Sequence, residues 1–318
     1  MIKASASDRR SPAEATTPPA ELSPAALPFL RELGDLKRIF SAQAPGSIAE
    51  RLFALGWAAM VRGEAPATVM SQTVSAALVS ARLGDLDLAK LTALGLGADA
   101  VPLLERAFDA VTHDLDPILA QRLRAALPLG RPVSGETPLF VGKLARQPRA
   151  GVTCPGQPRI LLQPAENHAE HCLMVAVYGV LASPQYGADP VVVFLAGMAH
   201  HLHNADMPDS GYSGEMLLGD LRASAIQTAR QACFDELTAI TPDLAGTIAA
   251  ALAPISGDTT PEARAFHVAD VLDRVLEIEQ HLRAARLTME VVLGEYELVH
   301  DGPVKAFHDR ILADVGLA

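Results

Sequence analysis

The stretch from Glu166 to Asp209 constrains this chain most, because it sets five histidines around two apolar segments of helical length. The five are His168 and His171 at its start and His200, His201 and His203 near its end. Residues three apart share one face of a helix, so each group can present its imidazoles in one direction. We expect two packed helices that bring several imidazoles together, and imidazole is a ligand for zinc, iron, nickel and copper.

The composition of the whole chain favours helices. Of its 318 residues 49% are hydrophobic and only 4% are aromatic, and alanine and leucine predominate. Such a composition is typical of helices packed through small and aliphatic side chains. Brief turns between the apolar segments favour antiparallel neighbours, and neither a convincing strand pattern nor an internal repeat is apparent. We therefore predict an all-α helical bundle.

Proline and glycine divide the chain into four parts. Residues 1–24 lack apolar periodicity and are expected to form a mobile tail, and residues 25–127 form an N-terminal helical region. Residues 128–165 contain seven prolines and are expected to be a linker or covering loop. Residues 166–318 are predicted to be a second helical domain, which ends in helices over 288–299 and 304–315.

Charge and hydropathy exclude some classes of partner. The formal net charge of −11 argues against a broad nucleic-acid footprint, which needs clustered Lys and Arg. No apolar run reaches the roughly 18 residues of a membrane span. Three cysteines without a CxxC pair fit a reducing cytoplasm. We expect a cytoplasmic protein with a small-molecule substrate, and a homodimer is compatible with this composition.

Acidic side chains are available to complete a metal site. Asp206 and Asp209 follow the second histidine group, and Asp270 interrupts an otherwise apolar helical face. A buried carboxylate is costly unless it is paired or bound to a metal. A buried polar cluster without a metal would also satisfy these residues, whereas Asp273, Glu277 and Glu279 are expected on a solvated helix face.

Three segments resemble the HD-domain metallohydrolases over roughly residues 166–300. Residues 166–172 read ENHAEHC and are similar to the ENxAEHS opening of the branch that includes 5′-deoxynucleotidases. Residues 197–201, GMAHH, are similar to the step that carries the second ligand, and residues 269–273, ADVLD, to the segment of the last aspartate. The resemblance implies that His171, His200 and Asp270 bind a divalent metal ion.

The chain departs from this family at one ligand, because His201 stands where the HD aspartate is expected. A neutral imidazole cannot bridge two ions as a carboxylate does. We expect one ion, of iron, zinc, manganese or cobalt, with His201 as a substitute ligand. A site rebuilt with His168, His203 or Asp206 is the other possibility.

The resemblance also implies a reaction. The family's hydrolases act on phosphate esters, so we expect hydrolysis of a phosphorylated small molecule or nucleotide. Asp206 or Glu215 would orient or deprotonate the water. No lysine lies between Lys143 and Lys305, so an anionic substrate is expected to meet arginine, with Arg222 and Arg274 as candidates.

Two other functions remain open at this point. Histidine-rich HD sites also host non-haem iron oxygenases, which would need iron and further ligands. The His201 substitution is equally compatible with a catalytically degenerate HD module that binds a ligand or partner and has a regulatory role.

Overall fold

The computed structural model describes residues 26–286 continuously and single positions further along. The predicted tail over 1–24 and the helices predicted over 288–299 and 304–315 lie outside that continuous range. Within it the chain is all-α, as the sequence predicts, and β1 (Phe40–Ser41) and β2 (Ala44–Ser47) form a small antiparallel hairpin.

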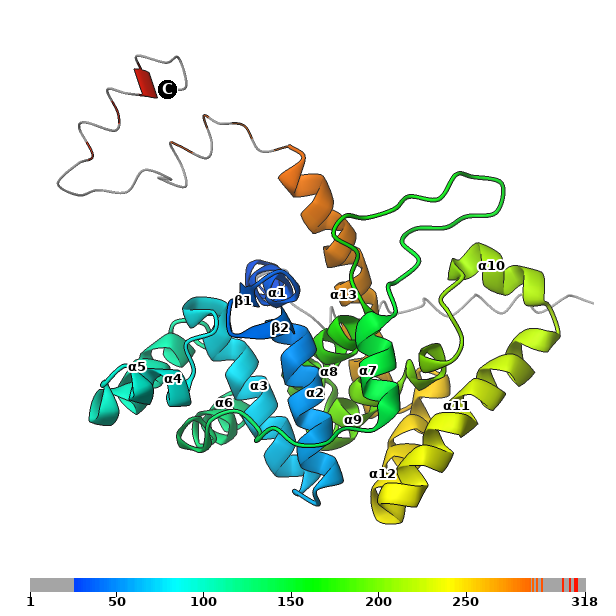
Figure 1. The fold of residues 1–318 in the computed structure, drawn as a ribbon, viewed down its shortest axis with the longest axis horizontal. Coiled ribbons are helices and arrows are strands. Elements are labelled where there is room, and N and C mark those ends of the chain that lie inside the picture. The colour runs from blue at the N-terminus through cyan, green and yellow to red at the C-terminus, as the bar shows by residue number, and fades with distance from the viewer. Residues whose placement is uncertain are drawn as a thin grey trace, which may run out of the picture.

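The described helices surround a central pair, α8 and α9 (Figure 1). In chain order they are α1 (Leu27–Gly34), α2 (Ile48–Val61), α3 (Pro66–Leu83), α4 (Leu88–Ala93), α5 (Ala100–Asp109), α6 (Pro117–Arg124), α7 (Leu139–Arg146), α8 (His168–Tyr186), α9 (Pro190–Ala199), α10 (Gly211–Leu218), α11 (Leu221–Ile240), α12 (Pro242–Leu252) and α13 (Pro261–Ala284). Short 3-10 turns follow α1, at Asp35–Lys37, and α9, at Leu202–Ala205.

Helix α8 is the centre of the molecule. Every residue from its start to Ser183 is buried, and it packs against α2, α7, α9 and α13 (Figure 1). A helix that is apolar on all sides is stable only when other helices surround it. Its start is fixed by a capping box between Asn167 and Glu170, and Gly187 ends it in the left-handed conformation.

Helices α8 and α9 approach each other unusually closely. A Cβ atom added at Gly197 of α9 would lie 2.5 Å from the Cα of Ala176 in α8. Only glycine at that position lets the two backbones come so near. The contact lies one turn from the end of α9, so it sets how far His200 stands from α8.

The N-terminal helical region shares its core with the C-terminal part. Buried side chains from both regions belong to one hydrophobic cluster. Trp57 of α2 meets Phe140 of α7 edge to face, with ring centroids 5.0 Å apart. The Tyr178 hydroxyl of α8 donates a 2.7 Å hydrogen bond to the carbonyl of Leu30 in α1. These contacts join the two regions without a gap between their cores.

The segment predicted as a linker contains a helix. Helix α7 lies within residues 128–165, and its apolar side chains Phe140, Val141 and Leu144 are buried. Proline flanks α7 but does not interrupt it, so a short helix fits between the breaks. Residues 147–167 then form the long loop that leads to α8.

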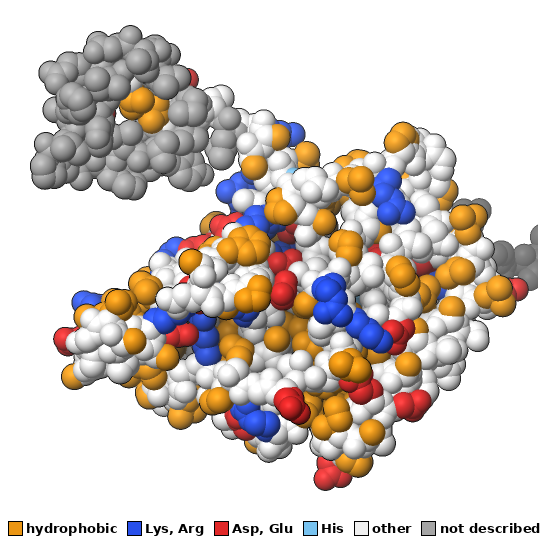
Figure 2. Space-filling view, in the orientation of Figure 1, with side chains coloured by type: hydrophobic (Ala, Val, Ile, Leu, Met, Phe, Trp, Pro, Cys, Tyr) orange, Lys and Arg blue, Asp and Glu red, His pale blue; other side chains and the backbone are white. Residues whose placement is uncertain are grey.

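Charged side chains of both signs are scattered over the face shown in Figure 2, among hydrophobic and uncharged areas. Lys and Arg form no continuous basic area on this face. Among the described residues, no helix combines the length and the hydropathy needed to cross a membrane.

Candidate metal centre

His171 lies one turn inside α8 and is fully buried. Its Nδ1 lies 2.7 Å from Oδ2 of Asp273 on α13, so this nitrogen carries a proton and donates it to the carboxylate. The Nε2 atom is thereby directed toward α9. A carboxylate that fixes the tautomer of a histidine in this way is the usual support of a metal-binding imidazole.

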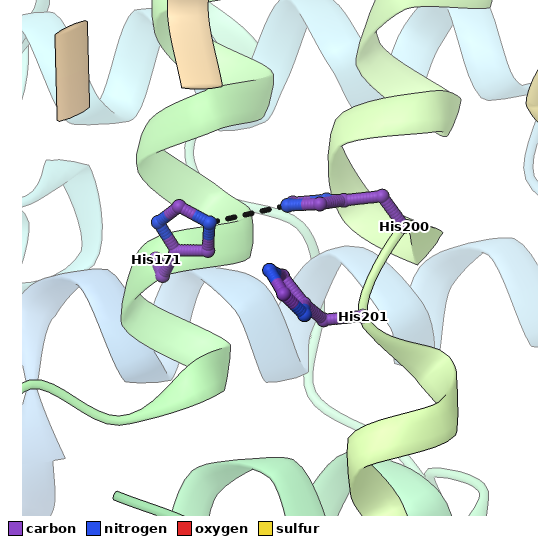
Figure 3. Close-up of side chains that lie close together, drawn as sticks. All are labelled: His171, His200 and His201. Atoms are coloured by element: carbon purple, nitrogen blue, oxygen red, sulfur yellow. Dashed lines mark hydrogen bonds between the residues drawn. The ribbon is translucent and has the colours of Figure 1, made fainter. Parts of the chain in front are cut away.

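His200 meets His171 from the end of α9. Its Nδ1 donates to the carbonyl of Gly197 at 2.8 Å, and its Nε2 lies 3.2 Å from Nε2 of His171 (Figure 3). Zinc–nitrogen bonds of about 2.0–2.1 Å in a tetrahedral site put two nitrogens about 3.3 Å apart. The observed spacing therefore fits two ligands of one ion.

His201 completes the group of imidazoles. Its Nδ1 lies 2.7 Å from Oδ1 of Asn204, which leaves Nε2 as the free nitrogen. The ring centroid lies 5.0 Å from that of His171 and 4.3 Å from that of His200. One nitrogen from each of the three rings lies within 4.8 Å of the others, and Figure 3 shows the rings converging between α8 and α9.

Asp270 adds a carboxylate from α13. Its Oδ1 lies 3.3 Å from Nε2 of His171. Burial opposes the charged form, but the hydrogen bond and the charge of His171 outweigh it and hold the pKa of Asp270 well below its usual range. Burial likewise opposes the charged form of His171, but hydrogen bonds to Asp270 and Asp273 raise its pKa above the ordinary value. The two carboxylates thus favour a positive charge beside His171, which a proton or a metal ion can supply.

A buried ring of charges supports His171 from behind. The ammonium of Lys37, which follows α1, lies 2.7 Å from Glu166, 2.8 Å from Asp273 and 3.0 Å from Glu277. Lys37 and these three carboxylates are at most 8% exposed. The expectation of a solvated helix face is wrong for Asp273 and Glu277, because α1 and its following turn cover that part of α13.

His168 lies beside the three converging imidazoles and is completely buried. Its ring centroid is 4.8 Å from that of His201, its Nε2 is 3.6 Å from Oδ2 of Asp209, and neither ring nitrogen has a hydrogen-bond partner among the described residues. Burial, reinforced by the charge of Arg149, lowers the pKa of His168 to about 2. The ring is therefore neutral.

His203 is more distant than His168. Its ring centroid lies 5.5 Å from that of His201, and its Nδ1 has no partner among the described residues. Burial and the charge of Arg230 lower the pKa of His203 to about 4. The structure thus places His168 and His203 around the cluster rather than in it.

The structure directs the other predicted residues elsewhere, with one exception. Asp206 pairs with Lys143 at 2.5 Å on the surface. Glu215 and Arg222 pair with each other on α10 and α11 at 2.7 Å. Arg274 does lie at the site, with Nη1 3.6 Å from Oδ2 of Asp270, and its side chain is 59% exposed.

Arg149 is a site residue that the sequence analysis missed. Its Nε lies 3.9 Å from Oδ2 of Asp209, and its Nη1 is buried without a partner among the described residues. Its charge acts on the pKa values of all four neighbouring imidazoles, His168, His171, His200 and His201. The only signal in the sequence was the basic character of the loop before α8.

Comparison of the chain with family models, with curated proteins and with solved structures finds no match.

Proposed function

We propose that this chain is a metal-dependent hydrolase of the HD superfamily that acts on a phosphorylated small molecule. One divalent ion, of iron, zinc, manganese or cobalt, would be bound by His171, His200, His201 and Asp270. The main support is that each of the three imidazoles donates its Nδ1–H away from the cluster, which leaves Nε2 facing the others. Outer hydrogen bonds of this kind orient metal-binding histidines.

The ion and the chain divide the chemistry between them. A divalent ion in this position polarises a phosphoryl oxygen and acidifies water. The chain holds the imidazoles in one tautomer through Asp273, Gly197 and Asn204. Burial of His171 keeps the interior side of the site dry, which strengthens each electrostatic interaction there.

Among the described residues, Arg149 is best placed to bind the substrate anion. A guanidinium with a buried, unpartnered Nη1 beside the imidazoles is an anion-binding group that no described residue satisfies. Arginine binds phosphate through two parallel N–H donors, which suits a phosphate ester. Arg274 provides a second, solvated cation next to Asp270. We assign the anion to Arg149 with Arg274, and not to Arg222, which Glu215 neutralises.

A proton acceptor lies on the same side of the site. His168 is neutral and buried, and its Nε2 faces Asp209 at 3.6 Å. Asp209 is held in turn by the backbone N–H groups of Ala150 and Gly211. In this proposal Asp209 takes the proton-handling role that the sequence suggested for Asp206 or Glu215. His168 packs beside it as a neutral ring, because a group with a pKa of about 2 is too weak a base to accept a proton at neutral pH.

The ligand set also supports a second candidate, a non-haem iron oxygenase. Three imidazoles and one carboxylate are richer in nitrogen than a site built for hard ions such as Mg²⁺ or Mn²⁺. Such a ligand set can bind iron, and a bound iron ion can react with O2. This candidate takes the same four ligands and differs in the ion and the reaction.

The test begins with metal analysis of protein purified without chelator. We expect about one equivalent of a transition metal, and we expect His200→Ala to lose it while His113→Ala, a change at an exposed histidine, retains it. Release of inorganic phosphate from a panel of nucleotides and sugar phosphates then tests the reaction.

The outcomes separate the candidates. Zinc, manganese or cobalt with phosphate release supports the hydrolase. Stoichiometric iron with O2 consumption and no phosphate release favours the oxygenase. If the folded protein contains no metal, and His200→Ala changes neither its folding nor its activity, both enzyme candidates are contradicted. The binding or regulatory module is then the candidate that is left.

A further inference from the structure

Two helix starts in this chain are built alike. Residues 47–51 read SIAER and residues 167–171 read NHAEH. The first residue of each is the N-cap of α2 or α8, and its side chain accepts a hydrogen bond from the backbone N–H of Glu50 at 3.1 Å or of Glu170 at 2.9 Å. A capping residue followed by Ala-Glu at matching positions gives the two helices the same first turn.

The chain enters both helices in the same way. The N–H of Ile48 donates to the carbonyl of Ile39 at 2.9 Å, and the N–H of His168 donates to the carbonyl of Gln147 at 3.1 Å. The residue after each acceptor forms a β-bridge with the N-cap, Phe40 with Ser47 and Pro148 with Asn167. A short helix precedes each acceptor, α1 with its 3-10 turn in one case and α7 in the other.

The following helices match as well. Both α3 and α9 begin with proline. Counted from the helix starts, Gly56 of α2 and Ala176 of α8 are equivalent, as are Thr73 of α3 and Gly197 of α9. A Cβ added at Gly56 would lie 3.6 Å from Thr73, and one added at Gly197 would lie 2.5 Å from Ala176. The two helix pairs therefore cross at equivalent residues.

The two copies also bind each other reciprocally. The Ser47 hydroxyl donates to Oε1 of Glu170 at 2.6 Å, and Nδ2 of Asn167 donates to Oε2 of Glu50 at 2.9 Å. The N-cap of each helix thus reaches the capping glutamate of the other. In an interface between identical subunits, such crossed pairing is the mark of a two-fold axis.

We propose that α1–α3 are a second, metal-free copy of α7–α9, packed on it about a local two-fold axis, and that this copy positions the metal-binding end of α8. In the register above, Arg51 stands at the place of His171, and Ala76 stands at the place of His200. The copy therefore carries no ligands. The positioning part of the proposal rests on the metal site of the proposed function.

The positioning contacts converge on the segment just before His171. Three of its polar side chains bind a residue of the copy: Glu166 binds Lys37, Asn167 binds Glu50, and Glu170 binds Ser47. Lys37 also binds Asp273, the acceptor of the His171 proton. These residues touch no reacting atom and act through the orientation of α8.

The two-fold relation is tested by building a site in the copy. Arg51→His with Ala76→His should place two imidazoles as His171 and His200 are placed. Ala76 borders a hollow that also touches Gln72 and Val79, so a larger side chain has room. Asp85 loses Arg51 but keeps Arg131 at 2.7 Å.

We expect the double variant to bind one more equivalent of Cu²⁺ than the wild type or either single variant, because imidazole binds Cu²⁺ most tightly among the first-row ions. Equilibrium dialysis gives the count, and electron paramagnetic resonance gives the number of coordinating nitrogens. A folded double variant that binds no more Cu²⁺ than the single variants overturns the two-fold relation. This result does not depend on whether the natural site binds metal.

The positioning role is tested by Ser47→Ala against Ser75→Ala. Both hydroxyls are buried and both donate to an acceptor at 2.6 Å, but Ser75 binds Leu123 and not the segment before His171. We expect Ser47→Ala to raise the dissociation constant of the natural metal about tenfold, and Ser75→Ala to change it less than about twofold.

Thermal unfolding of the same two variants separates positioning from general destabilisation. If Ser47→Ala and Ser75→Ala lower the Tm equally and also change the metal affinity equally, the positioning role is contradicted. This holds whatever the outcome for the engineered site. If the wild type binds no metal, the proposed function and the positioning role fail together, and the Cu²⁺ count still decides the two-fold relation. A double variant that does not fold also counts against the two-fold relation, because Ala76 borders a hollow and Asp85 keeps Arg131 as its partner. The serine pair then decides the positioning role alone.

Discussion

In the proposed metal site, His201 would set which ion is preferred. It supplies a neutral nitrogen where a carboxylate would add a negative charge and a hard oxygen ligand. We predict that His201→Asp shifts the preference from zinc toward manganese, because oxygen ligands suit the harder ion. Competition of Mn²⁺ against Zn²⁺ at one site measures the change. As a control, His201→Gln should weaken the binding of both ions without changing which of them binds more tightly. An unchanged order of affinities in His201→Asp would contradict the assignment of His201 as a metal ligand.

Asp85 makes the stability of the fold depend on pH. Burial opposes its charged form, but hydrogen bonds from Lys90, Arg131, Ser41 and Arg51 outweigh it and hold the pKa of Asp85 well below its usual range. A carboxyl with a depressed folded-state pKa contributes stability above its unfolded pKa, and the contribution is lost as pH falls toward the folded value.

We therefore predict that Asp85→Asn lowers the free energy of unfolding by about 2 kcal/mol at pH 7, and that the difference from wild type shrinks below about pH 4. Urea unfolding at several pH values measures both. Asp114→Asn, at a carboxylate whose side chain is 73% exposed, should change stability little at any pH. A difference for Asp85→Asn that stays constant down to pH 3 would refute this account.

At the residue scale, the residues that form the candidate cluster were easier to predict from the sequence than the residues that support them. His171, His200 and Asp270 stand at recognisable spacings on helices, and the structure brings them together. Lys37 and Arg149 were missed because their partners are distant in sequence or lie across a loop. Their roles depend on packing, which no local pattern records.

At the scale of elements, the crossing of α8 and α9 decides how far apart His171 and His200 lie. We predict that Gly197→Ala costs about 1–3 kcal/mol in unfolding free energy, because its Cβ meets the backbone of α8. It should also weaken metal binding, since it pushes α9 away from His171. Chemical denaturation and metal titration measure the two effects.

Gly246→Ala provides the matched control, because a Cβ there meets nothing within 4 Å. In the middle of α12 this change should stabilise the protein by about 0.5–1 kcal/mol, as alanine favours helix over glycine. If both glycine changes stabilise the protein, the close approach of α8 and α9 is not a constraint.

Most helices were predictable because their apolar stripes and their caps agree. The sequence pattern predicts one helix over residues 47–64 and another over residues 65–84, and the structure has α2 and α3 there. The pattern over residues 215–237 predicts a single helix, whereas the structure has two, since α10 ends at Leu218 and Gly219 has a positive φ. Helix α7 was missed because the surrounding prolines suggested a loop, although none of them falls inside it.

At the scale of the whole molecule, Lys37 links the two regions through charge. We predict that Lys37→Met costs about 3–5 kcal/mol in unfolding free energy, because it leaves buried carboxylates without their cation. Arg31→Ala serves as the control. It removes an ion pair to Glu279 whose side chains are each 33% exposed, and solvent-screened pairs of this kind contribute little to stability. Equal losses of unfolding free energy in the two variants would show that the buried position of Lys37 does not increase its contribution to stability.

The whole-molecule organisation was the least predictable part. The prolines of residues 128–165 predict a division of the chain and no repeat is apparent in the sequence, whereas both described regions share one hydrophobic core and, in our proposal, contain two similar helix pairs. Only a few residues are shared between those pairs, and the loops before α2 and α8 differ greatly in length. Hydrogen bonds and helix crossings preserve the likeness where side-chain identity does not.

The burial of α8 has a consequence for synthesis. A ribosome releases α2 and α3 well before α8 exists, and domains fold as their elements emerge. Until then, the apolar side of α2 that later covers α8 is open to solvent, together with the Lys37 ammonium that awaits its carboxylates. The nascent chain therefore exposes apolar surface and an unpaired Lys37 until α8 and α13, which cover them, have been synthesised.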